Sequence, residues 1–140
     1  MGWHMSPRTV YLARLIGIYC ILIALAMLSH KQATVEVVIA FLHNPPLIFF
    51  LGVIMVVAGL ALVLGHNVWS GGAETVVVTL TSWIVLLKGA MLLFVSPEAE
   101  SSLFLDTLRY EQFFYFYSSI TLVLGLYLVY AASGRQAAKR

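Results

Sequence analysis

The sequence predicts an all-α, polytopic membrane protein in which four transmembrane helices form a left-handed antiparallel bundle. Four long apolar runs cover residues 10–28, 47–64, 76–95 and 113–132. Each run is close to the roughly 20 residues that a helix needs to cross about 30 Å of hydrocarbon. Hydrophobic residues make up 61% of the chain and charged residues 10%, whereas about 25% of residues are charged in soluble domains.

A soluble fold is excluded by surface area. A chain of 140 residues has too little polar surface to cover four apolar helices of this length. One bundle uses the whole sequence, so a single transmembrane domain is expected over residues 1–140. The expected helices are about 10–28, 47–66, 74–95 and 110–132.

The first helix, at residues 10–28, is expected to be retained rather than cleaved as a signal peptide. Its apolar run is longer than the 7–15 residues typical of a signal-peptide core. The residues that follow, Ser29 to Gln32, contain no small-x-small cleavage site. The single cysteine, Cys20, lies inside this helix, so no intrachain disulfide can form.

The connections between the helices differ in character. The first is too long for a tight turn, and its apolar segment at residues 33–42 predicts a short helix lying at the outer interface. Pro45 and Pro46 would end that segment, and a proline suits the first turn of the next helix. The second connection contains Gly71 and Gly72 and predicts a short turn.

The charged residues predict the orientation in the membrane. Lysine and arginine gather at the end of the bundle that holds both termini, which places this end in the cytoplasm. The residues on this side are Arg8, Arg14, Arg135, Lys139 and Arg140, against Lys31 and Arg109 on the other. The chain is therefore expected to be a multi-pass protein of the cell membrane, with N- and C-termini in the cytoplasm.

Small and polar residues recur at a spacing of seven along each expected helix. Residues seven apart drift by only about 20° around a helix, so each set marks a stripe on one face. Helices in lipid associate through small residues and interhelical hydrogen bonds, which predicts that the stripes turn inward. The stripes are Gly17, Ala24 and Lys31; Gly52, Gly59 and His66; Glu74, Thr81 and Lys88; and Glu111, Ser118 and Gly125.

Lys88 lies inside the third apolar run, about 18 Å along the helix axis from Val76 and about 10 Å from Val95. A lysine at the bilayer centre costs roughly 2.5–3.5 kcal/mol on insertion scales, so such residues usually face protein or water. Two interpretations stay open. Lys88 extends outward or pairs with Glu111, which ties the third helix to the fourth. Alternatively it serves transport, since a lysine in an apolar site can lose its proton near neutral pH.

Further polar residues are expected at the cytoplasmic end of the bundle. Arg14 and Glu74 lie at similar depth and form a second candidate pair, although such an arginine also reaches lipid headgroups. His66, Asn67 and Trp69 end the second helix, where imidazole and amide groups are expected to cap the last carbonyls. A metal-binding or proton-relay role for His66 is the alternative. No second ligand stands at metal spacing, so no metal site is predicted.

The residues from His66 onward resemble a pattern found in one group of proteins. The stretches His66-Asn67-Val68-Trp69, Val78-Thr79-Leu80-Thr81-Ser82-Trp83 and Leu87-Lys88-Gly89 are similar to a pattern in small uncharacterised bacterial inner-membrane proteins with four helices. The resemblance implies the fold and an inner-membrane location, and no activity. It also implies that six residues form one unit of the family's design: His66, Asn67, Trp69, Trp83, Lys88 and Gly89.

The sequence favours an interaction protein over an enzyme. It contains no phosphate-binding loop, no Ser/His/Asp arrangement and no basic patch for nucleic acid, and no cofactor is expected. The predicted function is a non-enzymatic scaffold or accessory subunit, which contacts itself, another membrane protein and membrane lipids through its helix faces. The alternative is a small oligomeric proton or ion channel or transporter, whose path uses Lys88 and the stripe of Glu74 and Thr81. An enzyme with His66 as general base is a third hypothesis.

Overall fold

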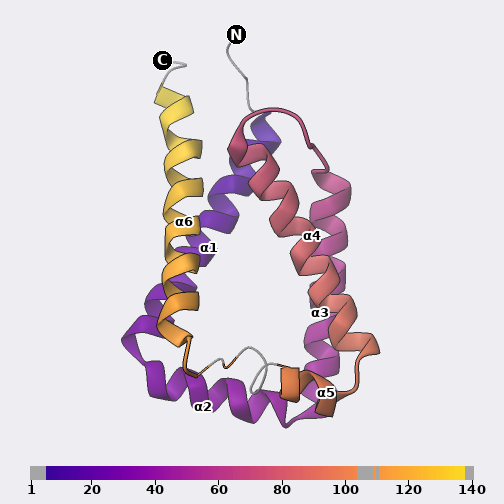
Figure 1. Cartoon of the computed structure of the whole chain (residues 1–140). Helices are drawn as coiled ribbons and strands as arrows, with labels where there is room; N and C mark the ends of the chain where they lie inside the picture. The colour runs from indigo at the N-terminus through magenta and orange to yellow at the C-terminus, as the bar shows by residue number, and fades with distance from the viewer. Residues whose placement is uncertain (1–5, 104–108, 110, 138–140) are drawn as a thin grey trace.

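The computed structural model describes residues 6–103, 109 and 111–137, and regular structure in these residues is helical. Four of the helices are long and apolar enough to cross a membrane. This confirms the predicted all-α membrane protein with four transmembrane helices. The helices are α1 (Pro7–Ser29), α2 (Lys31–Leu42), α3 (Pro45–Gly65), α4 (Ala73–Phe94), α5 (Pro97–Ser102) and α6 (Phe114–Ala137) (Figure 1).

Local capping explains where the first and third helices begin. The Ser6 side chain accepts a hydrogen bond from the backbone N–H of Thr9, and Pro7 opens α1. The Asn44 side chain accepts from the backbone N–H of Leu47 in the same way. Proline lacks an N–H and therefore costs nothing in a first turn, so α3 starts at Pro45, two residues earlier than the predicted start.

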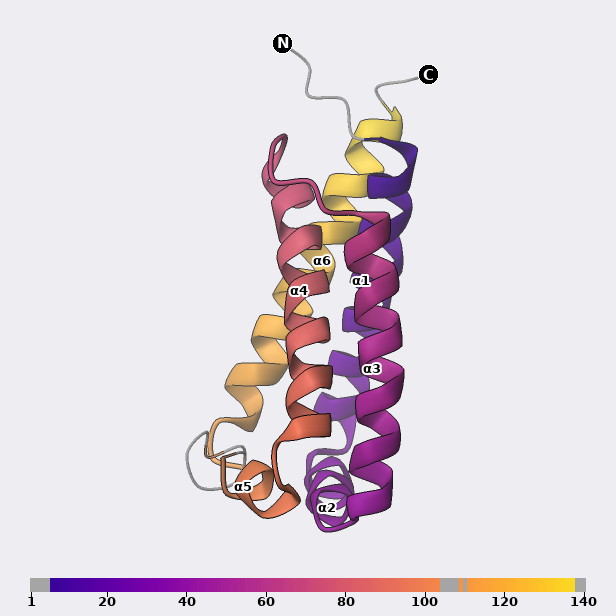
Figure 2. The same ribbon diagram turned by 90° about the vertical axis from the view of Figure 1, so that its right-hand side faces the viewer.

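The predicted interfacial helix is present as α2, which begins at Lys31 rather than at residue 33. It lies crosswise at the foot of the long helices in Figure 1 and is seen nearly end-on in Figure 2. Val35 of α2 packs against Phe114 at the start of α6, with Val38 and Ile39 beside it. Part of the apolar side of α2, around Val35, therefore packs against the first turn of α6.

The four long helices form two pairs. In each pair the helices pack along their lengths, α1 against α6 and α3 against α4, as Figures 1 and 2 both show. The pairs converge where α1 meets α4, at the end that holds the chain termini, and diverge toward α2. The bundle is therefore closed at one end and open at the other.

Glycines set the distance between the helices in each pair. A Cβ added to Gly17 of α1 would lie 2.9 Å from the carbonyl oxygen of Gly125, and one added to Gly125 of α6 would lie 2.8 Å from that of Gly17. In the other pair, a Cβ on Gly59 would lie 2.6 Å from Leu86 Cα. Glycine allows backbones to approach this closely in lipid. These stripe residues therefore face the partner within each pair.

Three stripe residues lie outside the helices to which they were assigned. Lys31 belongs to α2, because α1 ends at Ser29 and the backbone of His30 is not helical. Glu111 precedes α6, which begins at Phe114 rather than at residue 110. His66 follows the last residue of α3. Helix ends depend on local backbone geometry, which a spacing of seven does not report.

The closed end is sealed by a small apolar core. Side chains of α1, α4 and α6 meet there and are at most 8% exposed. Ala13, Cys20 and Ala132 have short side chains, which allow the helices to come close at this point. The buried members are Ala13, Ile16, Cys20, Val78, Leu128 and Ala132.

Candidate functional site

The segment between α3 and α4 folds back along α4. Its Val68 backbone N–H donates to the Thr79 hydroxyl at 3.3 Å, and that hydroxyl lies 2.7 Å from the Val68 carbonyl oxygen, to which it donates. The Thr75 carbonyl oxygen also lies 3.1 Å from the Thr79 hydroxyl oxygen. Thr79 is fully buried, so one buried side chain satisfies both backbone groups of Val68.

Asn67 joins two tryptophans at the same place. The indole N–H of Trp69 donates to Asn67 Oδ1 at 2.8 Å, and that of Trp83 on α4 donates to the same oxygen at 3.4 Å. We call these three residues the Asn67 cluster. The structure thus brings together Asn67, Trp69 and Trp83, which the resemblance placed in one unit. Asn67 was expected to cap α3, and it instead accepts from two indoles.

His66 caps α3 through its backbone. Its N–H donates to the Leu62 carbonyl oxygen at 2.8 Å, while its imidazole is 3% exposed. Within the described part of the chain, Nε2 of this ring makes no hydrogen bond. The described residues also contain no group of three His, Cys, Asp or Glu side chains arranged to hold a metal ion.

Glu74 lies buried in the first turn of α4. Its carboxylate turns back over the helix N-terminus, since a Cβ on Gly72 would collide with it. The helix dipole stabilises a negative charge at this position, and the lack of a side chain at Gly72 leaves room for it. Arg14 is half-buried on α1, and its pairing with Glu74 stays a prediction.

The other polar stripe residues use their hydroxyls locally. Thr81 donates to Val77 O and Ser118 donates to Phe114 O, each at 2.8 Å and one helical turn away. These bonds lie within single helices. Lys88 is half-buried on α4, about 9 Å along the axis from the end of that helix. Its pairing with Glu111 stays a prediction.

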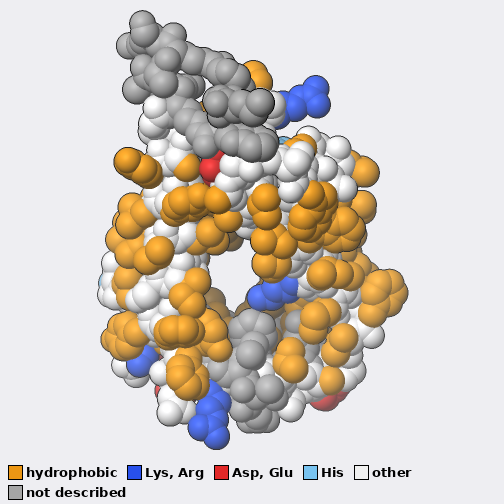
Figure 3. All heavy atoms as spheres, turned by 45° about the horizontal axis from the view of Figure 1, so that its top comes forward, with side chains coloured by type: hydrophobic (Ala, Val, Ile, Leu, Met, Phe, Trp, Pro, Cys, Tyr) orange, Lys and Arg blue, Asp and Glu red, His pale blue; other side chains and the backbone are white. Residues whose placement is uncertain are grey.

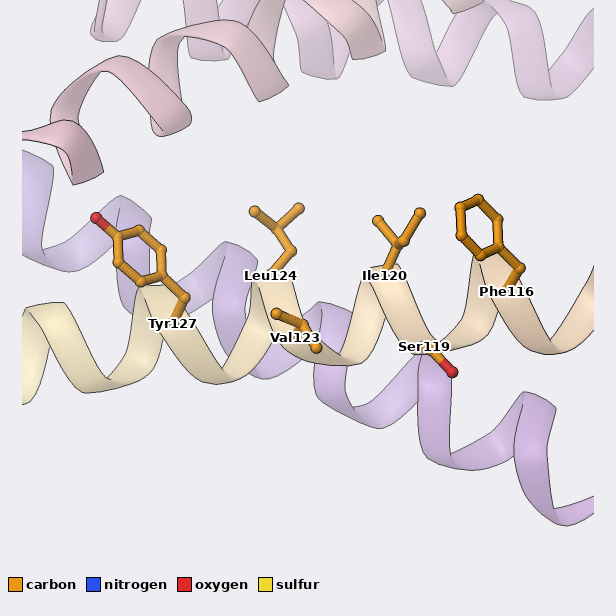
Figure 4. Close-up of a pocket in the computed structure, with 6 residues that line it drawn as sticks. All are labelled: Phe116, Ser119, Ile120, Val123, Leu124 and Tyr127. Carbon is orange, nitrogen blue, oxygen red and sulfur yellow. The ribbon is translucent and has the colours of Figure 1, made fainter.

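Two hollows lie toward the open end of the molecule. The outer hollow, of about 640 Å³, is lined by Lys31, Ile39, Arg109, Glu111 and Gln112. The α6 groove, of about 460 Å³, is lined by six residues of that helix, which Figure 4 shows as sticks. They are Phe116, Ser119, Ile120, Val123, Leu124 and Tyr127.

Lys31 is a site residue whose surroundings the sequence does not reveal. Its ammonium lies 4.8 Å from the ring centroid of Tyr115 and 5.9 Å from that of Phe114. These distances are typical of cation–π contacts. In the sequence, the aromatic run at the start of α6 is the one signal for these contacts. The same run is also typical of an interfacial aromatic belt.

Comparison of the chain with protein-family models, curated proteins and solved structures finds no match. The resemblance to bacterial four-helix proteins therefore stays an expectation. What the fold itself defines is a multi-pass, all-helical membrane protein.

Replacing Thr79 with valine is expected to destabilise the protein by about 1–3 kcal/mol, because both backbone groups of Val68 lose their buried partner. The measurement is the free energy of unfolding in mixed micelles. Thr81→Val is the matched control, since the Thr81 hydroxyl bonds inside its own helix, and it should change stability by less than about 0.5 kcal/mol. An equal effect of the two variants would contradict the role given to Thr79.

Proposed function

We propose that the protein is a non-enzymatic membrane scaffold or accessory subunit, which acts through helix-face contacts with itself or with another membrane protein. The observation that carries this proposal is the separation of the long helices into two pairs. Each pair is closed by glycine contacts, yet the pairs meet at one end of the molecule. Long apolar faces therefore remain available for contacts between molecules.

The outer face of α3 offers one such surface. Phe50, Val57 and Leu64 are 63%, 63% and 82% exposed, and they stand seven residues apart. The glycines that contact α4 have the same spacing and are buried. A heptad stripe of large apolar residues is the pattern that packs against another helix. We call these three residues the α3 outer face.

We also propose that the protein lies in the inner membrane, with both termini in the cytoplasm. The location follows the resemblance to small bacterial four-helix proteins, and the orientation follows the positive-inside rule. Arg8 and Arg14 lie near the start of α1, while Lys31 opens α2 at the opposite end of the bundle. Arg135 lies on the same side as the termini, near the end of α6.

A photo-crosslinking side chain at position 57 in native membranes tests the interaction role. We expect a defined protein adduct from Val57, because this residue faces away from α4. Val63 of the same helix is 8% exposed and serves as the matched control. Lipid adducts alone at position 57, or the same protein adduct at both positions, would contradict a contact through the α3 outer face.

Ion or proton conduction through Lys88 has less support. A path along the membrane normal would have to pass the closed end, where Ala13, Val78 and Leu128 form part of a buried apolar core. We expect proteoliposomes with wild-type protein or Lys88→Met to show the same flux as empty vesicles. Wild-type flux that the variant loses, at equal insertion, would instead place Lys88 on a conducting path.

A further inference from the structure

The space between the two helix pairs cannot stay empty in a bilayer. Figure 3 shows an opening through the space-filled molecule, bordered by hydrophobic side chains and by a lysine or arginine. The α6 groove has a volume of about 460 Å³ and lies open, since Phe116, Ile120 and Val123 of its lining are 61%, 51% and 65% exposed. Apolar walls of this extent gain contacts from any chain that fills the space.

The α6 groove has the length and character of an acyl-chain site. It runs from Phe116 to Tyr127, about 16 Å along the helix axis. In Figure 4, Phe116, Ile120 and Leu124 point from one side of α6 into the space before the facing helices. Its lining is almost wholly apolar, with Ser119 the exception among aliphatic and aromatic side chains.

Positive charge lies at the outer end of this groove. Ser119 and Val123 continue, at a spacing of four, the helical row that begins with Tyr115. The Lys31 ammonium lies 4.8 Å from the Tyr115 ring centroid, which puts a cation where the row begins.

Arg109 adds a second cation to the same place. It lines the outer hollow together with Lys31 and donates a hydrogen bond to Gln112 Oε1 at 3.5 Å. Glu111 is the acidic residue of this lining. Two cations against one anion leave the outer hollow with a net positive charge.

We propose that this surface binds an anionic phospholipid, with its phosphate at Lys31 and Arg109 and one acyl chain along the α6 groove. Lys31 is the first residue of α2, and Arg109 lines the outer hollow with Lys31 and Ile39 of that helix. Helix α2 lies crosswise at the foot of the bundle (Figure 1), the level of lipid headgroups. Basic side chains at that level attract anionic lipid. A zwitterionic lipid would fill the groove equally well but would gain little from the net charge. This inference goes beyond the proposed function and concerns a different face from the α3 outer face.

The headgroup arm of the test measures binding of phosphatidylglycerol and of phosphatidylcholine with the same chains, by native mass spectrometry of the purified protein. We expect wild type to prefer phosphatidylglycerol by about thirtyfold, at about fivefold per cation. Lys31→Gln and Arg109→Gln should each lose about fivefold, and together should abolish the preference. Arg8→Gln, at the opposite end of α1, is the matched control and should keep it.

The second part of the test concerns the acyl chain and fills the α6 groove with larger side chains. Ile120→Trp with Val123→Trp should weaken binding of both lipids, while Leu126→Trp, an exposed position outside the groove lining, should not. Equal binding of the two lipids by wild type, or a preference that survives loss of both cations, would overturn the proposal. The proposal would also be overturned if wild type were a dimer and the groove variants were monomers with their bound lipid unchanged. A second copy of the protein would then fill the groove. None of these variants touches Val57, so cross-linking from that position reports on the proposed function separately.

Discussion

Replacing Gly59 with leucine is expected to push α3 away from α4 and to destabilise the protein by about 3 kcal/mol. A Cβ at this position would lie 2.6 Å from Leu86 Cα and 2.7 Å from the Leu86 backbone nitrogen. Backbone atoms cannot rotate aside as a side-chain end can, so the helices must separate. The measurement is the free energy of unfolding in mixed micelles, followed by tryptophan fluorescence.

The same helix supplies the control for this experiment. Gly65, the last residue of α3, has no atom within 4 Å of an added Cβ. Gly65→Leu adds the same side chain and is expected to change stability by less than about 0.5 kcal/mol. If both variants lost the same stability, the loss would come from apolar bulk in general rather than from the contact with Leu86.

In the other pair, replacing Gly125 with leucine is expected to separate α6 from α1 at a similar cost of about 3 kcal/mol. A Cβ here would lie 2.8 Å from the Gly17 carbonyl oxygen and 3.0 Å from Cys20 Cβ. A distance measurement between spin labels on α1 and α6 should show the helices moving apart. Gly134→Leu, on the same helix with open space around it, should leave the distance unchanged.

The milder alanine variants test whether the two pairs are energetically separate. Gly59→Ala and Gly125→Ala act in different pairs, so their losses of stability should add within about 0.5 kcal/mol. A coupling larger than that between the two sites would contradict the two-pair description. It would indicate one cooperative bundle in which both contacts depend on the same core.

The sequence predicts the transmembrane spans well but not the helix pairing. Spans follow from apolar length, and Pro45 and Pro46 mark the start of α3 because proline tolerates a first turn. The glycine stripes identify contact faces correctly. The stripes do not predict which helix each face contacts. Gly17 and Gly59 are both stripe glycines, yet Gly17 contacts α6 and Gly59 contacts α4. Gly89 belongs to no stripe, yet a Cβ on it would lie 2.7 Å from the Val56 backbone nitrogen.

The candidate site is predictable only in part for a similar reason. Asn67 and Trp69 stand out in the sequence, and the resemblance links them to Trp83. Thr79 does not stand out, since a buried hydroxyl in an apolar helix usually bonds within that helix. Its bond to Val68 depends on α4 extending past the end of α3, so that the connecting segment returns alongside it. That offset is a property of helix register, which hydropathy does not encode.

The nested order of the helix pairs has a consequence for how the chain assembles during synthesis. The partners α3 and α4 are neighbours in sequence, whereas α1 pairs with the last helix, α6. The inner pair is therefore complete while α6 is still being translated, a delay of a few seconds at about 5–20 residues per second. During that interval the Gly17 face of α1 meets lipid or the insertion machinery instead of α6. A released chain that ends before α6 should thus form the inner hairpin beside a first helix that lacks its partner.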